Sequence, residues 1–232
     1  MISRNILKFL GLLFTSPLYS QFYDAGLWSE ISLQSEISKR TEVAITPEIR
    51  WDENISRVAR AFCDFGVQHK VSSLMSLSCI YRSGVAHDYE DTEFRQRIQL
   101  GAAFKWKGKK ITWAYLPRWQ VSMRGGGEYD ADLSTLMRNR FQVKWNLPKK
   151  FELSGYAEFF HSTGSYDFAD WQSWRANCML SKDLKGPHSL ALGYLIQHQL
   201  SSQIPRTDFV IVTSYRIDIE LSGEEKAKVA AP

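Results

Sequence analysis

Long apolar runs are absent from the sequence after its first 20 residues, because charged side chains interrupt every window as long as a membrane-crossing helix requires. Cysteine is scarce: Cys63, Cys79 and Cys178 have neither the spacing of metal ligands nor a paired framework. We therefore expect them to act as small apolar residues within strands, without a disulfide. The net charge of +4 is too small and too evenly spread to indicate a nucleic-acid partner. No pattern of residues indicates a cofactor or a metal ion.

The first 20 residues have the pattern of an export signal. Two basic residues precede an apolar run at 9–14, and small residues follow at Ser16 and Ser20. This arrangement predicts cleavage between Ser20 and Gln21, so that residues 1–20 form a signal peptide. An uncleaved membrane anchor is the alternative, but the apolar run is far shorter than the roughly 20 residues that a spanning helix needs.

Aromatic residues are unusually frequent in a chain of modest hydrophobicity. The sequence holds 8 Trp, 10 Tyr and 13 Phe, while 44% of its residues are hydrophobic and 23% are charged. A polar chain rich in Trp and Tyr is typical of a membrane barrel, which has an apolar outer belt, aromatic girdles at both interfaces and a polar interior.

From about Gly26 onward, apolar and polar residues alternate with period 2. The segment 94–106 places Phe94, Ile98, Leu100, Ala102, Phe104 and Trp106 on one face and Arg95, Arg97, Gln99, Gly101, Ala103 and Lys105 on the other. The segments 43–51, 111–123, 137–147 and 151–159 repeat this pattern. Tight turns are predicted near Lys39, Ser72, Gly108, Pro148 and Gly186, and longer polar connections near Asn54, Asp88, Gly126, Tyr166 and Gln203.

This pattern predicts an all-β fold: an up-and-down antiparallel transmembrane β-barrel over residues 21–219, with a polar lumen and about 10–12 strands. About eleven segments can be counted, whereas bacterial barrels usually have an even number. Residues 220–232 are expected to be a polar periplasmic tail. A soluble periplasmic β-domain, with its apolar faces turned inward, is the alternative. The export signal, the strand length and the Trp and Tyr residues near strand ends favour the barrel.

The polar faces carry charged residues that such a barrel would enclose: Glu30, Glu48, Arg50, Arg82, Arg95, Arg97, Arg118, Arg138, Arg140, Glu158 and Arg175. In a narrow lumen these side chains would lie within reach of one another. They can form a structural network of ion pairs, because an unpaired buried charge is unfavourable. They can also form an arginine-rich lining that favours the passage or binding of anions, as in a porin-like pore.

A lipid-modifying enzyme, either a hydrolase or an acyltransferase, is a further alternative. Such a barrel enzyme needs a nucleophile beside a base, and His161 with Thr163 is the candidate pair because residues two apart share a strand face. A single His near an aromatic girdle is more often an interfacial residue. The glycines at 125–127 lack a following helix and indicate an external loop, and the carboxylates at 88–93 indicate a solvated loop.

Short motifs complete the sequence evidence: Gly26-Leu27-Trp28-Ser29-Glu30, Pro47-Glu48-Ile49-Arg50, Tyr81-Arg82-Ser83-Gly84 and Phe94-Arg95-Gln96-Arg97. With the export signal, they resemble the outer-membrane family called domain of unknown function 2490. The resemblance covers nearly the whole mature chain. It implies a small barrel in the outer membrane of a Gram-negative bacterium, surrounded by outer-membrane lipid and inserted by the assembly machinery, without catalytic residues to carry over. The tail beyond Ile219 departs from barrels that end at their last strand.

Overall fold

The computed structural model describes residues 22–88, 91–125, 132–163, 171–200 and 206–220. The predicted signal peptide, the glycines at 126–127 and the tail from 221 onward lie outside these residues. The described chain forms eleven strands: β1 (Phe22–Ser38), β2 (Thr41–Asp52), β3 (Arg57–Lys70), β4 (Met75–Asp88), β5 (Asp91–Lys107), β6 (Ile111–Gly125), β7 (Asp132–Leu147), β8 (Phe151–Ser162), β9 (Trp171–Asp183), β10 (His188–Gln199) and β11 (Arg206–Ile219). Among these residues no helix is long and apolar enough to cross a bilayer.

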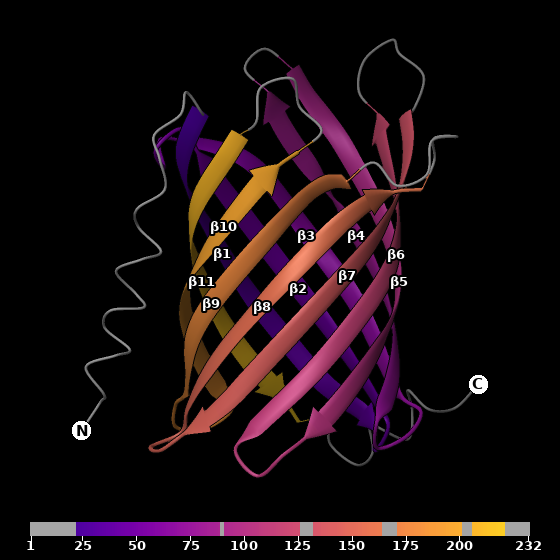
Figure 1. The fold of residues 1–232 in the computed structure, drawn as a ribbon, viewed down its shortest axis with the longest axis vertical. Coiled ribbons are helices and arrows are strands. Elements are labelled where there is room, and N and C mark those ends of the chain that lie inside the picture. The colour runs from indigo at the N-terminus through magenta and orange to yellow at the C-terminus, as the bar shows by residue number, and fades with distance from the viewer. Residues whose placement is uncertain (1–21, 89–90, 126–131, 164–170, 201–205, 221–232) are drawn as a thin grey trace.

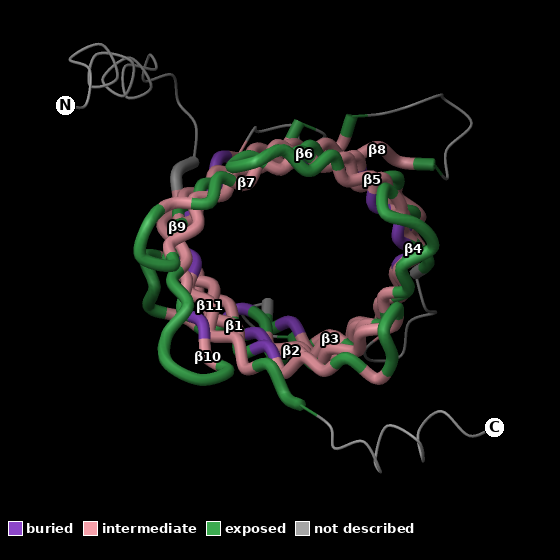
Figure 2. The backbone as a smooth tube through the Cα atoms, turned by 90° about the horizontal axis from the view of Figure 1, so that it is seen from below, coloured by how far each residue is buried: buried purple, intermediate pink, exposed green. Residues whose placement is uncertain are grey.

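The strands close into one barrel, in which each strand pairs with its neighbours in the sequence (Figures 1 and 2). These ten pairings are antiparallel, as expected for strands joined by hairpins. The eleven segments counted in the sequence are therefore eleven strands, and the first of them is a full strand of 17 residues.

The closing pair is parallel, which corrects the expectation of a wholly antiparallel barrel. β1 pairs with β11 in register from Phe22 opposite Arg206 to Ser35 opposite Ile219. The reason is parity: when hairpins join an odd number of strands, the first and last strands run in the same direction. The odd-numbered strands begin at one end, which we call the loop mouth, and finish at the other, the turn mouth. The start of β1 and the end of β11 consequently lie at opposite mouths.

The turn mouth has the short connections that the sequence predicts. Lys149 and Lys150, between β7 and β8, both have positive φ angles of 60° and 62°, the backbone of a two-residue hairpin turn. At the loop mouth two connections are shorter than predicted, since only residues 53–56 separate β2 from β3 and only residues 89–90 separate β4 from β5. The acidic residues Asp91 and Glu93, expected in a loop, belong to β5.

Apolar side chains face outward and charged side chains face the lumen, as the alternation predicts. Trp113 and Phe141 are 60% and 54% exposed on the outside, and Tyr115 stacks on Phe141 there. Arg97 and Arg140 line a cavity in the lumen instead. The three cysteines are free, and Cys79 and Cys178 are exposed. The fold therefore turns its large apolar surface away from its own centre.

A small apolar cluster lies on the lumen side of β10 and β11, where the sequence predicts only polar lining. Leu195, Val210 and Val212 are buried and pack against Trp28, Tyr156 and Met179. Gly193 makes room for this packing, because a Cβ at that position would collide with Met179. Leu195 and Val212 of this cluster give the smaller of the lumen cavities an apolar part of its wall.

The parallel closure can be tested by a cross-link. Ser29 and Thr213 are partners across the β1–β11 pair, with their hydroxyl oxygens 2.7 Å apart. In a chain whose native cysteines are replaced by alanine, we expect the double variant Ser29→Cys with Thr213→Cys to form a disulfide on oxidation, because paired positions meet the distance that a disulfide requires. The readout is faster migration of the denatured chain on a non-reducing gel.

The matched control for this cross-link is Ser29→Cys with Thr135→Cys. Thr135 lies on β7, which has no pairing with β1. No intramolecular disulfide should form in this control. Equal cross-linking in both variants, or none in the Ser29 and Thr213 pair, would contradict a β1–β11 closure.

Candidate functional site

The lumen contains two adjoining cavities with volumes of about 370 and 760 Å³. Five residues line both of them: Glu30, Asp64, Ile80, Arg118 and Arg140. The smaller cavity is surrounded by eight arginines: Arg50, Arg60, Arg82, Arg97, Arg118, Arg138, Arg140 and Arg175. Only three carboxylates line it, Glu30, Glu48 and Asp64. The described lining of this cavity is therefore strongly cationic.

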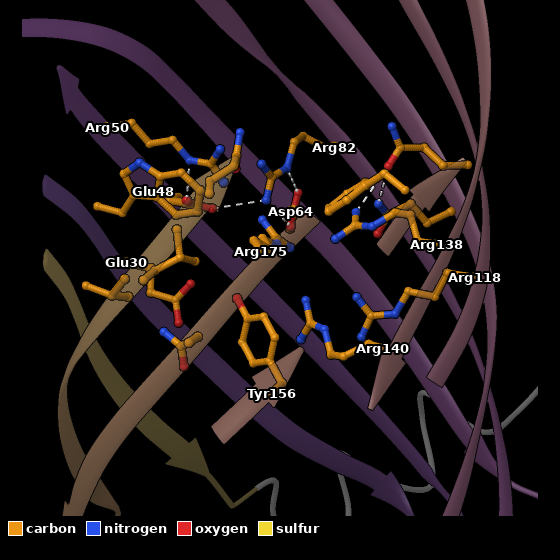
Figure 3. Close-up of a pocket in the computed structure, with 18 of the residues that line it drawn as sticks. Glu30, Glu48, Arg50, Asp64, Arg82, Arg118, Arg138, Arg140, Tyr156 and Arg175 are labelled. Atoms are coloured by element: carbon orange, nitrogen blue, oxygen red, sulfur yellow. Dashed lines mark hydrogen bonds and ion pairs between the residues drawn. The ribbon is translucent and has the colours of Figure 1, made fainter. Parts of the chain in front are cut away.

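One group of charges lies on β2, β3 and β4 and is nearly balanced. Glu48 accepts hydrogen bonds from Arg50 Nε at 2.6 Å and from Arg82 Nη2 at 3.0 Å. Arg82 Nη2 also donates to Asp64 at 2.7 Å. Figure 3 shows this group at one side of the cavity. Because two carboxylates meet two guanidinium groups, each buried charge here has a partner of the opposite sign.

Aromatic rings hold this balanced group in place. The Arg50 guanidinium carbon lies 3.5 Å from the centre of the Trp28 ring, and the Arg82 carbon lies 3.8 Å from the centre of the Phe62 ring. Such contacts between cations and ring faces are favourable, the more so away from water. Gly84 allows Phe62 to lie flat against the wall, since a Cβ at residue 84 would collide with the Phe62 backbone.

The second group of charges lies on β7, β8 and β9 and has one carboxylate for three arginines. Glu158 is completely buried and forms ion pairs with Arg138 at 3.0 Å, Arg140 at 3.1 Å and Arg175 at 2.6 Å. Arg138 also donates to the Gln120 side-chain oxygen at 3.1 Å. One carboxylate cannot neutralise three cations, so this wall of the lumen keeps an excess of positive charge.

Three further arginines of the cavity are not neutralised. Within the described part of the chain Arg60 and Arg97 form no ion pair, and Arg118 forms neither an ion pair nor a side-chain hydrogen bond. The Nε atom of Arg140 is buried without a hydrogen-bond partner. Glu30, on the opposite wall, lines the same cavity but is not in an ion pair with any of these described cations. The cationic excess therefore concentrates on the strands from β5 to β9.

The structure brings most of the predicted lumen residues together. The exception is Arg95, which lies near the loop mouth, away from the lining of both cavities, and pairs with Glu93 at 2.6 Å. Sequence reasoning missed Arg60, Asp64 and the hydrogen bond between the Gln99 and Gln120 side chains at 2.8 Å. Arg60 and Asp64 flank Phe62 at two-residue spacing on β3, so the same alternation could have identified them.

His161 and Thr163, the candidate catalytic pair, have other contacts in the structure. The His161 ring lies 3.8 Å from the ring of Trp171, an exposed outer residue, and Thr163 donates its hydroxyl hydrogen to Thr135 at 2.9 Å. No contact between His161 and Thr163 is present among the described residues. These positions fit an interfacial aromatic belt, and the enzymatic hypothesis stays a prediction.

Glu158 should be important for stability. Replacing it with Gln removes the only carboxylate of its group, and we expect a loss of roughly 3–5 kcal/mol in the free energy of unfolding, because breaking a buried ion pair leaves the partner charges uncompensated. Denaturant titration of the refolded protein in lipid vesicles measures this change.

The matched control is Glu152→Gln. Glu152 pairs with Lys144 at 2.9 Å on the same two strands, but both side chains are partly exposed. Such a pair contributes about 1 kcal/mol or less. If both variants lost the same small amount of stability, the network around Glu158 would have no special structural role.

Among the described residues no group of His, Cys, Asp and Glu side chains could hold a metal ion.

Comparisons with known proteins indicate the family to which this chain belongs. No curated protein matches the chain. The family described as "Protein of unknown function (DUF2490)" matches residues 25–207, which include β1 from its fourth residue, all of β2 to β10 and the first two residues of β11. The match agrees with the resemblance noted in the sequence and spans far more than half of the chain, so this protein is a member of the DUF2490 family.

Proposed function

We propose that this protein spans the outer membrane of a Gram-negative bacterium and gives small anions a narrow passage through an arginine-rich lumen. The observation that carries the proposal is the combination of an apolar outer surface with a lumen in which cations outnumber carboxylates. An apolar outer surface is favourable in contact with lipid. An excess of cations in the lumen attracts anions.

Three observations support a position within a membrane. The strands have 12 to 17 residues, more than the roughly 9–11 that a tilted membrane strand needs. Trp106, Trp113 and Trp145 are exposed near the turn mouth, and Trp171 is exposed near the loop mouth, as in the two girdles of a membrane barrel. The closed sheet leaves no unpaired edge, which a lipid environment requires.

The charge distribution supports anions as the solute. A purely structural network would pair its charges, as the group around Glu48 does. The strands β5 to β9 instead carry Arg97, Arg118, Arg138, Arg140 and Arg175 with Glu158 as their buried counter-charge. Unneutralised cations in an enclosed space raise the local concentration of anions and exclude other cations.

Cell fractionation tests the location. We expect the protein in the outer-membrane fraction, starting at Gln21 by N-terminal sequencing, and migrating differently on gels before and after heating because a folded barrel resists detergent. Recovery of the protein in the soluble periplasmic fraction without detergent would support the soluble β-domain instead.

Conductance across planar bilayers tests the passage. With a salt gradient we expect a reversal potential that indicates anion preference. Replacing both Arg97 and Arg118 with Gln should shift this potential toward zero, because the variant loses two unpaired lumen charges while it keeps both ion-pair groups.

A charge-matched control uses Lys109→Gln together with Lys110→Gln, two exposed residues in the turn between β5 and β6 that line neither lumen cavity. These changes remove the same charge from outside the narrow region and should leave the reversal potential close to that of the unmodified protein. The absence of discrete conductance, or an anion preference that survives loss of Arg97 and Arg118, would argue against this function.

A further inference from the structure

Two arginines stand together where the two lumen cavities adjoin. Arg118 on β6 lies opposite Arg138, and Arg140 on β7 lies opposite Leu116, so Arg118 and Arg140 are diagonal neighbours on adjacent strands. Both side chains line both cavities. Figure 3 shows their guanidinium groups directed into the same space. A solute that moves from one cavity to the other meets this pair.

The pair has unused hydrogen-bond donors. Among the described residues the Arg118 guanidinium makes no hydrogen bond. Arg140 donates to Glu158 through Nη2 at 3.1 Å, but its Nε atom is buried without a partner. Glu158 cannot compensate Arg118 as well, because its two oxygens already accept from Arg138, Arg140 and Arg175. Buried donors without an acceptor are unfavourable, and an oxygen-bearing anion between the two groups would satisfy them.

The surrounding residues leave space for Arg118 and hold Arg140. Gly101 lies directly opposite Arg118, and a Cβ at residue 101 would come within 3.0 Å of the Arg118 Cγ atom and of the Ser78 hydroxyl. The absence of that Cβ gives the Arg118 stem its space. Arg140 lies over the ring of Tyr156, with 4.1 Å between the guanidinium carbon and the ring centre. Arg140 is therefore held before any ligand arrives, and Arg118 has space beside it.

The electrostatics of the pair favour an anion. Arg118 and Arg140 carry the same charge on adjacent strands and line the same two cavities, so they repel each other. Such repulsion is stronger in an enclosed space than in water. A guanidinium group presents parallel N–H donors that match the oxygens of a carboxylate or a phosphate, whereas a halide offers a single acceptor. Two guanidinium groups without a carboxylate between them are suited to bind such a group.

We infer that Arg118 and Arg140, with Tyr156 beside them, form a binding site for a small oxyanion that carries a phosphate or carboxylate group. The inference names the class of solute for the passage proposed above and depends on that passage for access from the two mouths. The Tyr156 hydroxyl, which Figure 3 shows in the same space, is a third donor for the ligand.

Calorimetry on the refolded mature chain in detergent micelles tests the site without a membrane. With inorganic phosphate as the probe, in buffer with constant chloride, we expect saturable binding at one site per chain. Arg118→Gln should weaken binding at least tenfold, and this change breaks no ion pair of the fold. Tyr156→Phe should weaken it by a smaller factor, since the ring beneath Arg140 is kept. Titration with acetate measures a carboxylate at the same site.

The control variant is Arg95→Gln, which removes an arginine near the loop mouth and should leave phosphate binding unchanged. Gel mobility before and after heating verifies that each variant is folded. Phosphate and acetate binding no tighter than chloride, or phosphate binding equal in Arg118→Gln and the unmodified protein, would overturn the site. Anion-selective conductance without oxyanion binding would reject the site and retain the passage, whereas oxyanion binding without conductance would reject the passage and retain the site.

Discussion

The hydrogen bonds that join β1 to β11 are the constraint on which the rest of the molecule depends. They turn an open sheet into a closed wall, so that every strand has one enclosed face and one outer face. Once the wall is closed, side chains of the enclosed face can no longer be solvated freely and must find partners within the lumen. The ion pairs around Glu48 and Glu158 and the apolar cluster at Leu195 are two solutions to that requirement.

The charged lumen is closer to balance on one side than on the other. The strands β2 to β4 pair Arg50 and Arg82 with Glu48 and Asp64 and leave Arg60 without an ion pair among the described residues, whereas β7 to β9 place three arginines around Glu158. A barrel that used its charges only to fill space would gain nothing from this difference, because uncompensated cations oppose folding. Their presence in a stable closed fold is understandable if mobile anions supply the missing charge. The oxyanion proposed at Arg118 and Arg140 would supply part of that charge.

Much of the fold follows from short-range patterns, and much of the site does not. Alternation over 94–106 was sufficient to separate the two faces of β5, because side-chain direction has period 2 in any strand. The choice of which face lines the lumen also needed the export signal, the strand length and the Trp and Tyr residues near strand ends. The tight turn at 148–150 also sets Arg140 opposite Glu158. Glu158 and Arg175 lie on β8 and β9, which are joined by a longer connection, and the length of that connection does not determine the register of the two strands. Arg82 on β4 contacts Glu48 on β2 across the intervening strand β3, and this contact depends on the curvature of the wall. The parallel pairing of β1 with β11 follows from the odd number of strands alone. Bacterial barrels usually have an even number of strands, which argued against eleven.

The odd number of strands has a consequence for anything attached to the chain. The first residue of β1 and the last residue of β11 lie at opposite mouths of the barrel. Groups attached directly at Phe22 and at Ile219 would therefore lie at different mouths, separated by the full height of the wall. A label at each of these two strand ends would distinguish one mouth from the other.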